Sequence, residues 1–195
     1  MKFVYLLDPM TAIGSVSRYS EIMGALQGHF DKVAARLNER ILVAFIPAVP
    51  TPTAHDLIIY FVPGEISIVS QFAGRPRNPL TDDGDGFTSI KTSTSGGVTT
   101  ISVVSEVYVK TTNAKLLAAL AFHEAMHNRL ALGNGLHARD GMAQATVTPD
   151  THVTATNASQ MAAGFARSVK QWPDGVLPLV SRRIRRDGGD PLWYT

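Results

Sequence analysis

The amino-acid sequence predicts an α+β fold that forms a single domain over residues 1–195. Three observations support this prediction: several short runs of strand-forming residues, three segments with helical periodicity, and a hydrophobic content of 45% in a chain of 195 residues. A chain of that length and composition can bury one core but is short for two. We therefore expect one sheet with helices packed against it.

Five segments have the composition of strands. Two of them are apolar without interruption, which is typical of strands buried on both faces, and the last one alternates, which predicts one buried face and one wet face. The strands are expected at residues 3–7, 41–46, 56–62, 66–69 and 98–110. Between the last two, residues 74–97 are rich in Gly, Pro, Asp, Ser and Thr, and this composition predicts a long surface loop or a loose hairpin.

The three helical segments differ in their patterns. Over residues 17–40 apolar side chains recur at steps of three and four, and Ser15 or Ser17 can cap the amino end. Residues 112–132 contain no glycine or proline and are hydrophobic on several sides, which is typical of a central helix. Residues 157–171 carry apolar side chains at steps of four and predict a third helix.

Charge and composition argue against several classes of protein. The net charge is +2 and only 17% of residues are charged, so a nucleic-acid partner is not expected. The chain has no cysteine and therefore no disulfide framework. No apolar run is long enough to cross a bilayer, and residues 1–9 are too short for the apolar core of a signal peptide. We expect no membrane partner and a protein that is cytoplasmic or secreted by a route without a cleaved signal peptide.

The clearest functional motif is H-E-x-x-H at residues 123–127, within the predicted central helix. Residues four apart on a helix lie on one face, so His123 and His127 can bind one metal ion. Glu124 projects about 100° around the helix from His123 and is placed to act as a base. In this pattern two histidines bind zinc while the glutamate takes a proton from the water that attacks a carbonyl. The alternative interpretation is two histidines that are four apart by chance.

A catalytic zinc ion usually has three protein ligands, so a third ligand is needed. No glutamate follows Glu124 and there is no cysteine, which excludes a downstream glutamate and a thiolate. His137 is the preferred third ligand, because Gly133 or Gly135 can end the helix and turn the chain back towards the metal. Asp140 is the rival ligand; failing that, it could orient a ligand histidine by a hydrogen bond.

This stretch resembles the metzincin group of zincin metallopeptidases, whose signature is H-E-x-x-H-x-x-G-x-x-H followed by a methionine-containing turn. The matching residues are His123, Glu124, His127, a glycine, His137 and Met142. Nine residues separate His127 from His137 where the usual signature has five, so four extra residues must form added helix or a wider loop.

The resemblance implies a zincin-like fold with a mixed twisted sheet and an edge strand directly before a central active-site helix. An upper subdomain would span about residues 1–135, and a small, mainly helical lower subdomain would span about residues 136–195. The expected edge strand is residues 98–110, which would hold an extended peptide by backbone pairing. Tyr108 and His152 are candidates to stabilise the developing oxyanion.

The same resemblance implies a zinc-dependent metalloendopeptidase that hydrolyses a peptide or protein substrate. One Zn²⁺ would be held by His123, His127 and His137, and Glu124 would be the general base. Two alternatives belong to other classes. A non-catalytic binding module would have a structural metal with four protein ligands, which Asp140 could complete. A nucleic-acid-binding protein would use the arginines of residues 182–186, although the modest net charge is discouraging.

Overall fold

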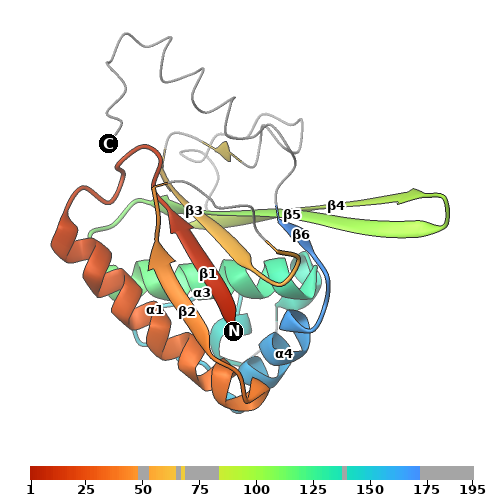
Figure 1. The fold of residues 1–195 in the computed structure, drawn as a ribbon. Helices are drawn as coiled ribbons and strands as arrows, with labels where there is room; N and C mark the ends of the chain where they lie inside the picture. The colour runs from red at the N-terminus through yellow and green to blue at the C-terminus, as the bar shows by residue number, and fades with distance from the viewer. Residues whose placement is uncertain (48–52, 65–66, 69–83, 138–139, 172–195) are drawn as a thin grey trace, which may run out of the picture.

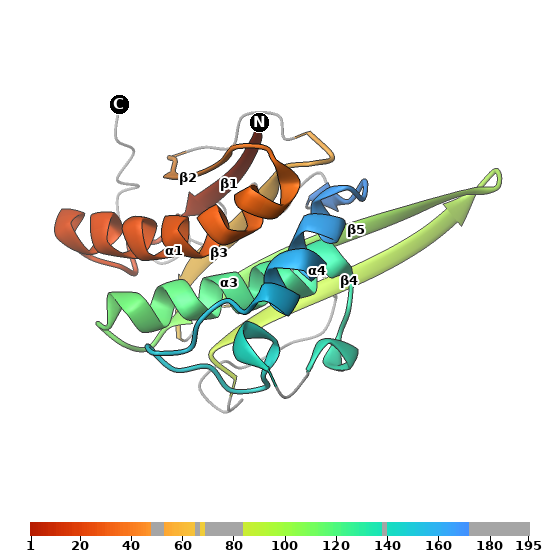
Figure 2. The same cartoon turned by 90° about the horizontal axis from the view of Figure 1, so that it is seen from below.

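The structure is a computed structural model that describes residues 1–47, 53–64, 67–68, 84–137 and 140–171. Within this part of the chain, the helices lie on one face of a six-stranded sheet (Figures 1 and 2), which confirms the α+β prediction. The strands are β1 Lys2–Leu7, β2 Ile41–Phe45, β3 Leu57–Pro63, β4 Gly86–Ser95, β5 Val98–Val109 and β6 Lys170–Gln171. The helices are α1 Val16–Leu37, α3 Ala114–Leu130 and α4 Ala155–Phe165, with the short 3-10 turns η1 Asn134–Leu136 and η2 Gly141–Ala143.

The sheet is mostly parallel, with the strand order β2-β1-β3-β5-β4. Each pair along this order is parallel except β5 and β4, which are antiparallel, and β6 adds a short parallel pairing to β5. Helix α1 connects β1 to β2, because parallel neighbours need a crossover connection. Ser15 caps this helix by accepting a hydrogen bond from the Arg18 amide at 3.4 Å, as the sequence predicts.

The edge strand beside the motif helix is β4, so the prediction that residues 98–110 form the edge is wrong. Those residues do form a strand, β5, but it lies between β3 and β4. Strand β4 comes from the stretch for which the sequence predicts a surface loop or loose hairpin. Gly96 and Gly97 close the hairpin with φ angles of 56° and 77°, as a two-residue turn with two left-handed residues requires.

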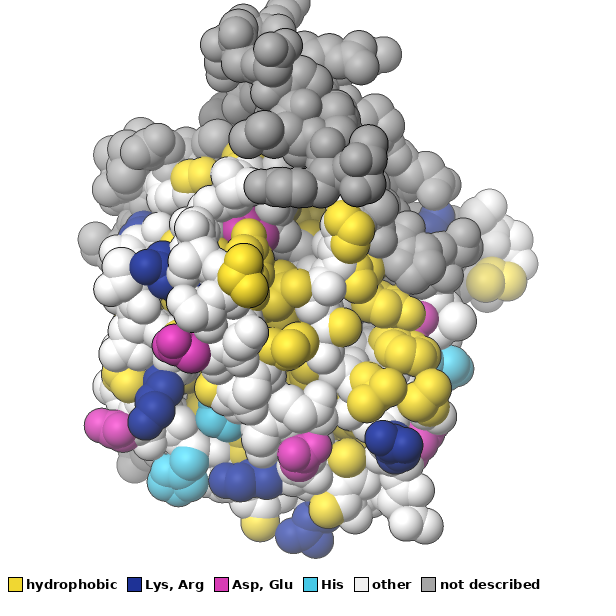
Figure 3. Space-filling view, turned by 60° about the vertical axis from the view of Figure 1, so that its left-hand side comes forward, with side chains coloured by type: hydrophobic (Ala, Val, Ile, Leu, Met, Phe, Trp, Pro, Cys, Tyr) yellow, Lys and Arg dark blue, Asp and Glu magenta, His cyan; other side chains and the backbone are white. Residues whose placement is uncertain are grey.

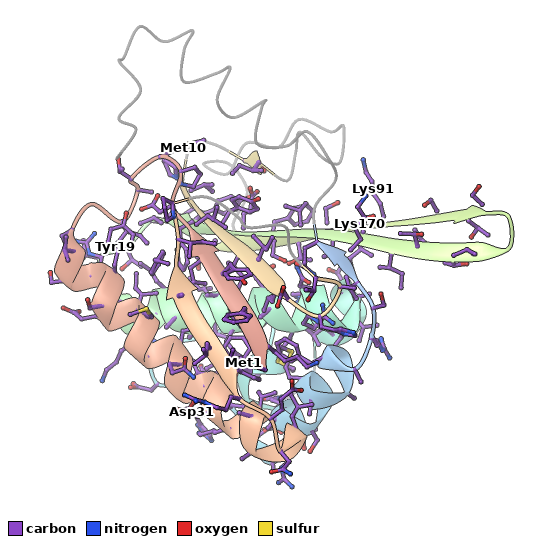
Figure 4. All side chains as sticks on the ribbon, viewed as in Figure 1. Met1, Met10, Tyr19, Asp31, Lys91 and Lys170 are labelled. Atoms are coloured by element: carbon purple, nitrogen blue, oxygen red, sulfur yellow. The ribbon has the colours of Figure 1, made fainter. Side chains whose placement is uncertain are left out.

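The outer half of the β4–β5 hairpin projects from the body of the molecule (Figure 1). All residues from Lys91 to Thr100 are exposed. Side chains fill the space between the sheet and the helices, whereas they stand apart from one another along this hairpin arm (Figure 4). The inner half of the hairpin is therefore the part that packs against the helices.

Both faces of the inner half of β5 are buried, which corrects the prediction of one wet face. Glu106 and Tyr108 on the face turned away from the helices are fully buried. The Glu106 carboxylate accepts hydrogen bonds from the Ser67 hydroxyl, from the Ile68 amide at 2.6 Å and from the Tyr108 hydroxyl at 2.7 Å. These donors offset the cost of burying the carboxylate.

Two apolar clusters lie on the two sides of the sheet. The larger one lies between the sheet and the helices and includes residues from β1 to α4. The smaller one lies on the other face; its members are Leu7, Ile58, Tyr60, Val62, Ile68, Val104 and Tyr108. Figure 3 shows apolar side chains gathered on one face of the molecule, next to the atoms drawn in grey.

Helix α3 is the centre of the fold, and 15 of its 17 residues are buried. It is shorter than the predicted 112–132, and Asn113 caps it by accepting a hydrogen bond from the Leu116 amide at 3.1 Å. Helix α4 ends at Phe165, well before the predicted residue 171, and the chain then forms β6. None of the helices in the described ranges is long and apolar enough to cross a membrane.

Arg129 at the end of α3 is a fully buried cation that holds three elements together. Its guanidinium donates hydrogen bonds to the carbonyl oxygens of Ala54 and Asp56, both just before β3, at 3.3 and 3.2 Å. It also donates to those of Gly164, in the last turn of α4, and Arg167, just after that helix, at 3.1 and 2.5 Å. Burial lowers its pKa to about 10, so it remains charged at neutral pH.

Two predictions fall largely or wholly outside the described residues. The strand expected at residues 66–69 includes only two residues that the structure describes, Ser67 and Ile68, and both are buried. The arginines of residues 182–186 lie entirely outside the described ranges.

Candidate metal centre

The three histidines that the sequence predicts as ligands meet beside α3. His123 and His127 lie one turn apart on that helix, and His137 follows the η1 turn. One potential ligand nitrogen from each histidine lies within 4.8 Å of the other two. The ring centroids of His123 and His127 are 4.7 Å apart, and they lie 5.5 and 5.2 Å from the His137 ring. The cluster could hold a metal ion.

The chain reverses after α3 through an alanine. The sequence predicts that Gly133 or Gly135 ends the helix, but Ala131 takes the left-handed conformation, with φ of 51°. The Leu132 amide then bonds to the His127 carbonyl oxygen at 3.2 Å. The η1 turn follows and returns the chain so that His137 faces the two helical histidines.

Backbone carbonyls determine which nitrogen of each helical histidine carries the proton. The His123 Nδ1 atom lies 2.7 Å from the carbonyl oxygen of Met142, and the His127 Nδ1 atom lies 2.7 Å from that of Leu132. A carbonyl oxygen can only accept a hydrogen bond, so each Nδ1 atom is the donor. In the neutral imidazoles, both Nε2 atoms therefore present a lone pair to the cluster.

The two Nε2 atoms of His123 and His127 are only 3.0 Å apart. Two lone pairs repel each other at that distance unless a cation lies beside both. A proton is a poor cation for this position at neutral pH, because burial lowers the pKa of His123 to about 4 and also lowers the pKa of His127. Nitrogens that bind one tetrahedral zinc ion at about 2.0–2.1 Å are about 3.3 Å apart. The geometry therefore fits a metal ion held through the Nε2 atoms.

The turn that orients His123 is fixed against α4. The Met142 amide donates a hydrogen bond to the Oδ1 atom of Asn157 at 2.8 Å. Gly141 has φ of 52°, and a Cβ atom there would lie 2.3 Å from the same Oδ1 atom. Only glycine fits this position. Helix α4 thus determines where the Met142 carbonyl lies, and through it the orientation of the His123 ring.

Glu124 lies between the histidines and the first residues of β4. Its side chain is buried, and the Thr88 hydroxyl donates a hydrogen bond to its Oε2 atom at 2.6 Å. A Cβ atom on Gly86 would lie 2.7 Å from its Oε1 atom, so the strand passes directly against the carboxylate. The base that the sequence predicts is therefore next to the edge strand and beside the histidine cluster.

A pocket of about 340 Å³ opens next to the three histidines. Its volume lies at the small end of the range for ligand sites. Its walls come from the start of β4 and the two residues before it, from α3, from the segment that leads to His137, and from the loop after Met142. The lining residues are Gly84, Asp85, Gly86, Phe87, Thr88, Leu120, His123, Glu124, His127, Gly133, Asn134, His137, Ala145, Thr146 and Val147.

Three other candidates from the sequence lie elsewhere. The Asp140 carboxylate accepts a hydrogen bond from the Thr154 hydroxyl at 2.9 Å and is not part of the cluster, so the structure favours His137 as the third ligand. Tyr108 lies on the sheet face opposite the site and donates to Glu106. His152 is exposed and does not line the pocket. The predictions of Tyr108 and His152 as donors at the site are therefore wrong.

Three residues that shape this site were not predicted from the sequence: Gly86, Thr88 and Asn157. One local pattern could have indicated Asn157, since Thr154 and Asn157 form a capping box at the start of α4. Gly86 and Thr88 belong to a strand that the sequence does not predict, so nothing in the sequence placed them near α3.

Comparisons with protein-family models, with curated proteins and with solved structures found no match to this chain. A function for this chain therefore has to be inferred from its own sequence motif and from the geometry of the site.

Proposed function

We propose that this protein is a zinc-dependent metallopeptidase. The observation that carries the proposal is the position of three imidazoles around one point, with two Nε2 lone pairs directed at it and a buried glutamate alongside. Imidazole nitrogens also suit copper, iron and nickel, so zinc is part of the proposal. The H-E-x-x-H motif favours zinc among these metals.

His123, His127 and His137 would hold the ion, which would supply a Lewis acid that acidifies water and polarises a peptide carbonyl. Glu124 would take the proton from the water that attacks the carbonyl carbon. It would then deliver that proton to the departing amine as the C–N bond breaks. The Thr88 hydroxyl would hold the Glu124 carboxylate in place during both transfers.

The position of β4 favours a peptide substrate. This strand is at the edge of the sheet in the described part of the chain, and its first residues line the pocket together with Glu124. An extended peptide added along that edge would bring a backbone carbonyl to the metal through main-chain hydrogen bonds. Recognition of this kind would depend little on the substrate's side chains.

The resemblance to metzincins belongs to the same proposal. The nine residues between His127 and His137 accommodate the last residues of α3, the reversal at Ala131 and the η1 turn. Met142 is fully buried in the η2 turn, and its carbonyl oxygen bonds to a ligand histidine. These features support the placement of η2 as a methionine turn within a zincin-like fold.

A structural metal site is the alternative, and it would require a fourth protein ligand. Among the described residues, the group that could hold an ion consists of three histidines only. The cluster also borders a pocket, as expected where an open coordination position meets a substrate. Both features favour the catalytic interpretation.

The test uses Glu124→Gln and His137→Ala, with Glu21→Gln as the matched control on the exposed side of α1. Zinc content is measured by elemental analysis, and cleavage is measured on a denatured protein mixture. We expect about one equivalent of zinc in the unmodified protein and in Glu124→Gln, with cleavage lost in the variant. His137→Ala should lose both zinc and cleavage, and the control should keep both. Unchanged cleavage in Glu124→Gln would eliminate the proposed base.

A further inference from the structure

A chain of buried polar side chains connects β6 to Glu124 across three other elements. Gln171, Asn128 and Ser105, in β6, α3 and β5, are 3%, 0% and 0% exposed. The Gln171 Nε2 atom donates to the Asn128 Oδ1 atom at 2.8 Å, and the Asn128 Nδ2 atom donates to the Ser105 hydroxyl at 3.0 Å. The Ser105 and Thr88 hydroxyls are 2.8 Å apart, and Thr88 donates to Glu124.

The direction of these hydrogen bonds follows from one backbone group. The Ile58 amide lies 3.2 Å from the Gln171 Oε1 atom, and an amide N–H can only donate. This contact assigns the oxygen of Gln171, so its nitrogen must face Asn128. The oxygen of Asn128 must then face Gln171, and its nitrogen faces Ser105.

The same direction continues through the two hydroxyl groups. The Ser105 oxygen accepts from Asn128, and among the described residues the acceptor within reach of its own hydrogen is the Thr88 oxygen. The single hydrogen of Thr88 is then directed to Glu124, where the Oε2 atom lies at 2.6 Å and the backbone oxygen at 3.3 Å. The opposite direction would leave the Ser105 hydrogen without an acceptor among the described residues.

Most of this chain has no contact with the pocket. Asn128, Ser105 and Gln171 do not line it, whereas Thr88 and Glu124 do. Buried amide and hydroxyl groups cost free energy unless they are paired, and apolar side chains would fill the same space more simply. The chain ends on Glu124, the side chain that would act as the base in the proposed reaction.

We propose that Thr88, Ser105 and Asn128 are positioning residues for the Glu124 carboxylate. Asn128 and Ser105 determine where the Thr88 hydrogen points, and Thr88 holds the Oε2 atom as an acceptor. On the other side, Gly86 leaves room for the Oε1 atom, which a Cβ atom would approach to 2.7 Å. The carboxylate is thus oriented by a pocket residue, Thr88, that is itself held by two core residues, Ser105 and Asn128, which do not line the pocket. The consequence for catalysis rests on the proposed peptidase function.

The experiment compares Thr88→Val, which keeps the shape and removes the hydroxyl, with Thr88→Ser, which keeps the hydroxyl. Thr92→Val on the exposed arm of the same strand is the matched control. Asn128→Leu tests a remote member of the chain. The first measurement is the carboxylate stretching band in infrared spectra of protein that carries ¹³C-labelled glutamate. Subtraction of the Glu124→Gln spectrum assigns that band to Glu124. Zinc content and the thermal midpoint are measured for each variant.

We expect the Glu124 band to shift in Thr88→Val and Asn128→Leu and to stay in place in Thr88→Ser and Thr92→Val. In Thr88→Val and Asn128→Leu, kcat for peptide cleavage should fall roughly 10- to 100-fold, while KM and zinc content stay unchanged. If the unmodified protein cleaves no peptide but the band shifts as expected, the positioning chain stands and the peptidase proposal fails. An identical band in all four variants, in folded protein, would overturn the positioning role. So would equal losses in Thr88→Ser and Thr88→Val.

Discussion

Replacing Gly141 with alanine should disturb the candidate metal site although this residue is not one of its three histidines. The backbone there has φ of 52°, and the new Cβ atom would lie 2.3 Å from Asn157 Oδ1 and 2.7 Å from Thr154 Cγ2. Asn157 would have to move, and it is the acceptor for the Met142 amide at 2.8 Å. The Met142 carbonyl would then lose its position against the His123 Nδ1 atom.

The expected size follows from two costs. The left-handed conformation costs a residue with a Cβ atom about 1–2 kcal/mol, and relief of the overlap brings the loss of unfolding free energy to about 2–4 kcal/mol. A ligand histidine whose hydrogen-bond partner is displaced typically binds metal about 10- to 100-fold more weakly. Urea unfolding of the metal-free protein measures the first quantity, and competition with a chromophoric chelator measures the second.

The control is Gly135→Ala, since Gly135 lies in the η1 turn just before His137 and a Cβ atom there would meet nothing within 4 Å. This variant should keep its zinc affinity and change stability by less than about 1 kcal/mol. The reasoning would be refuted if Gly141→Ala bound zinc as tightly as Gly135→Ala. It would also be refuted if both variants lost affinity equally.

Three further outcomes are expected. Gly86→Ala should keep zinc but lose peptide cleavage at least tenfold, because its Cβ atom would displace the Glu124 carboxylate; kinetics and metal analysis on one sample check this. Stability should fall as the pH drops from 6.5 towards 4, because burial, and secondarily Lys32, lowers the pKa of His29 to about 4, so the unfolded state takes up the proton first. His29 is partly exposed, so the free energies of unfolding from urea titrations at pH 7 and pH 4.5 should differ by about 1–2 kcal/mol more in the unmodified protein than in His29→Gln. Arg129→Met should lower the free energy of unfolding by about 3–5 kcal/mol in the same urea assay, because four carbonyl oxygens lose their donor. A decrease below about 1 kcal/mol would contradict the role assigned to Arg129.

Local spacing was enough to predict the two histidines that α3 contributes to the cluster. His123 and His127 share a helix face whatever the rest of the fold does, and the chain between them contains no residue that breaks a helix. His137 could also be predicted, because a short segment after a helix end can return only to nearby points. The predicted end of the helix, at Gly133 or Gly135, was two or four residues too late, since Ala131 adopts the left-handed conformation that glycine favours.

The edge strand could not be predicted because its sequence resembles a loop. β4 is rich in Ser and Thr, carries one charge, and owes its conformation to pairing with β5. Once Thr88 is known to pair with Ser105, both lie on the face of the sheet towards α3, which is how a hydroxyl reaches Glu124. That pairing depends on register between two strands, which composition does not determine.

The wrong prediction for Tyr108 is explained by strand parity once the position of the helices is known. Val107 faces the helices and belongs to the larger apolar cluster, so Tyr108, one residue further on, must point to the other face of the sheet. A donor on that face cannot reach a site built on α3. The sequence contained the alternation, and only the side on which the helix packs was unknown.

Because the motif residues lie on a helix of which 15 of 17 residues are buried, this helix should open only together with the elements packed around it. Amide hydrogens of residues 120–128 should exchange with deuterium only at the rate at which the entire domain unfolds. A bound ion would then slow that exchange in proportion to its affinity, so protection of this one helix would report occupancy without any substrate.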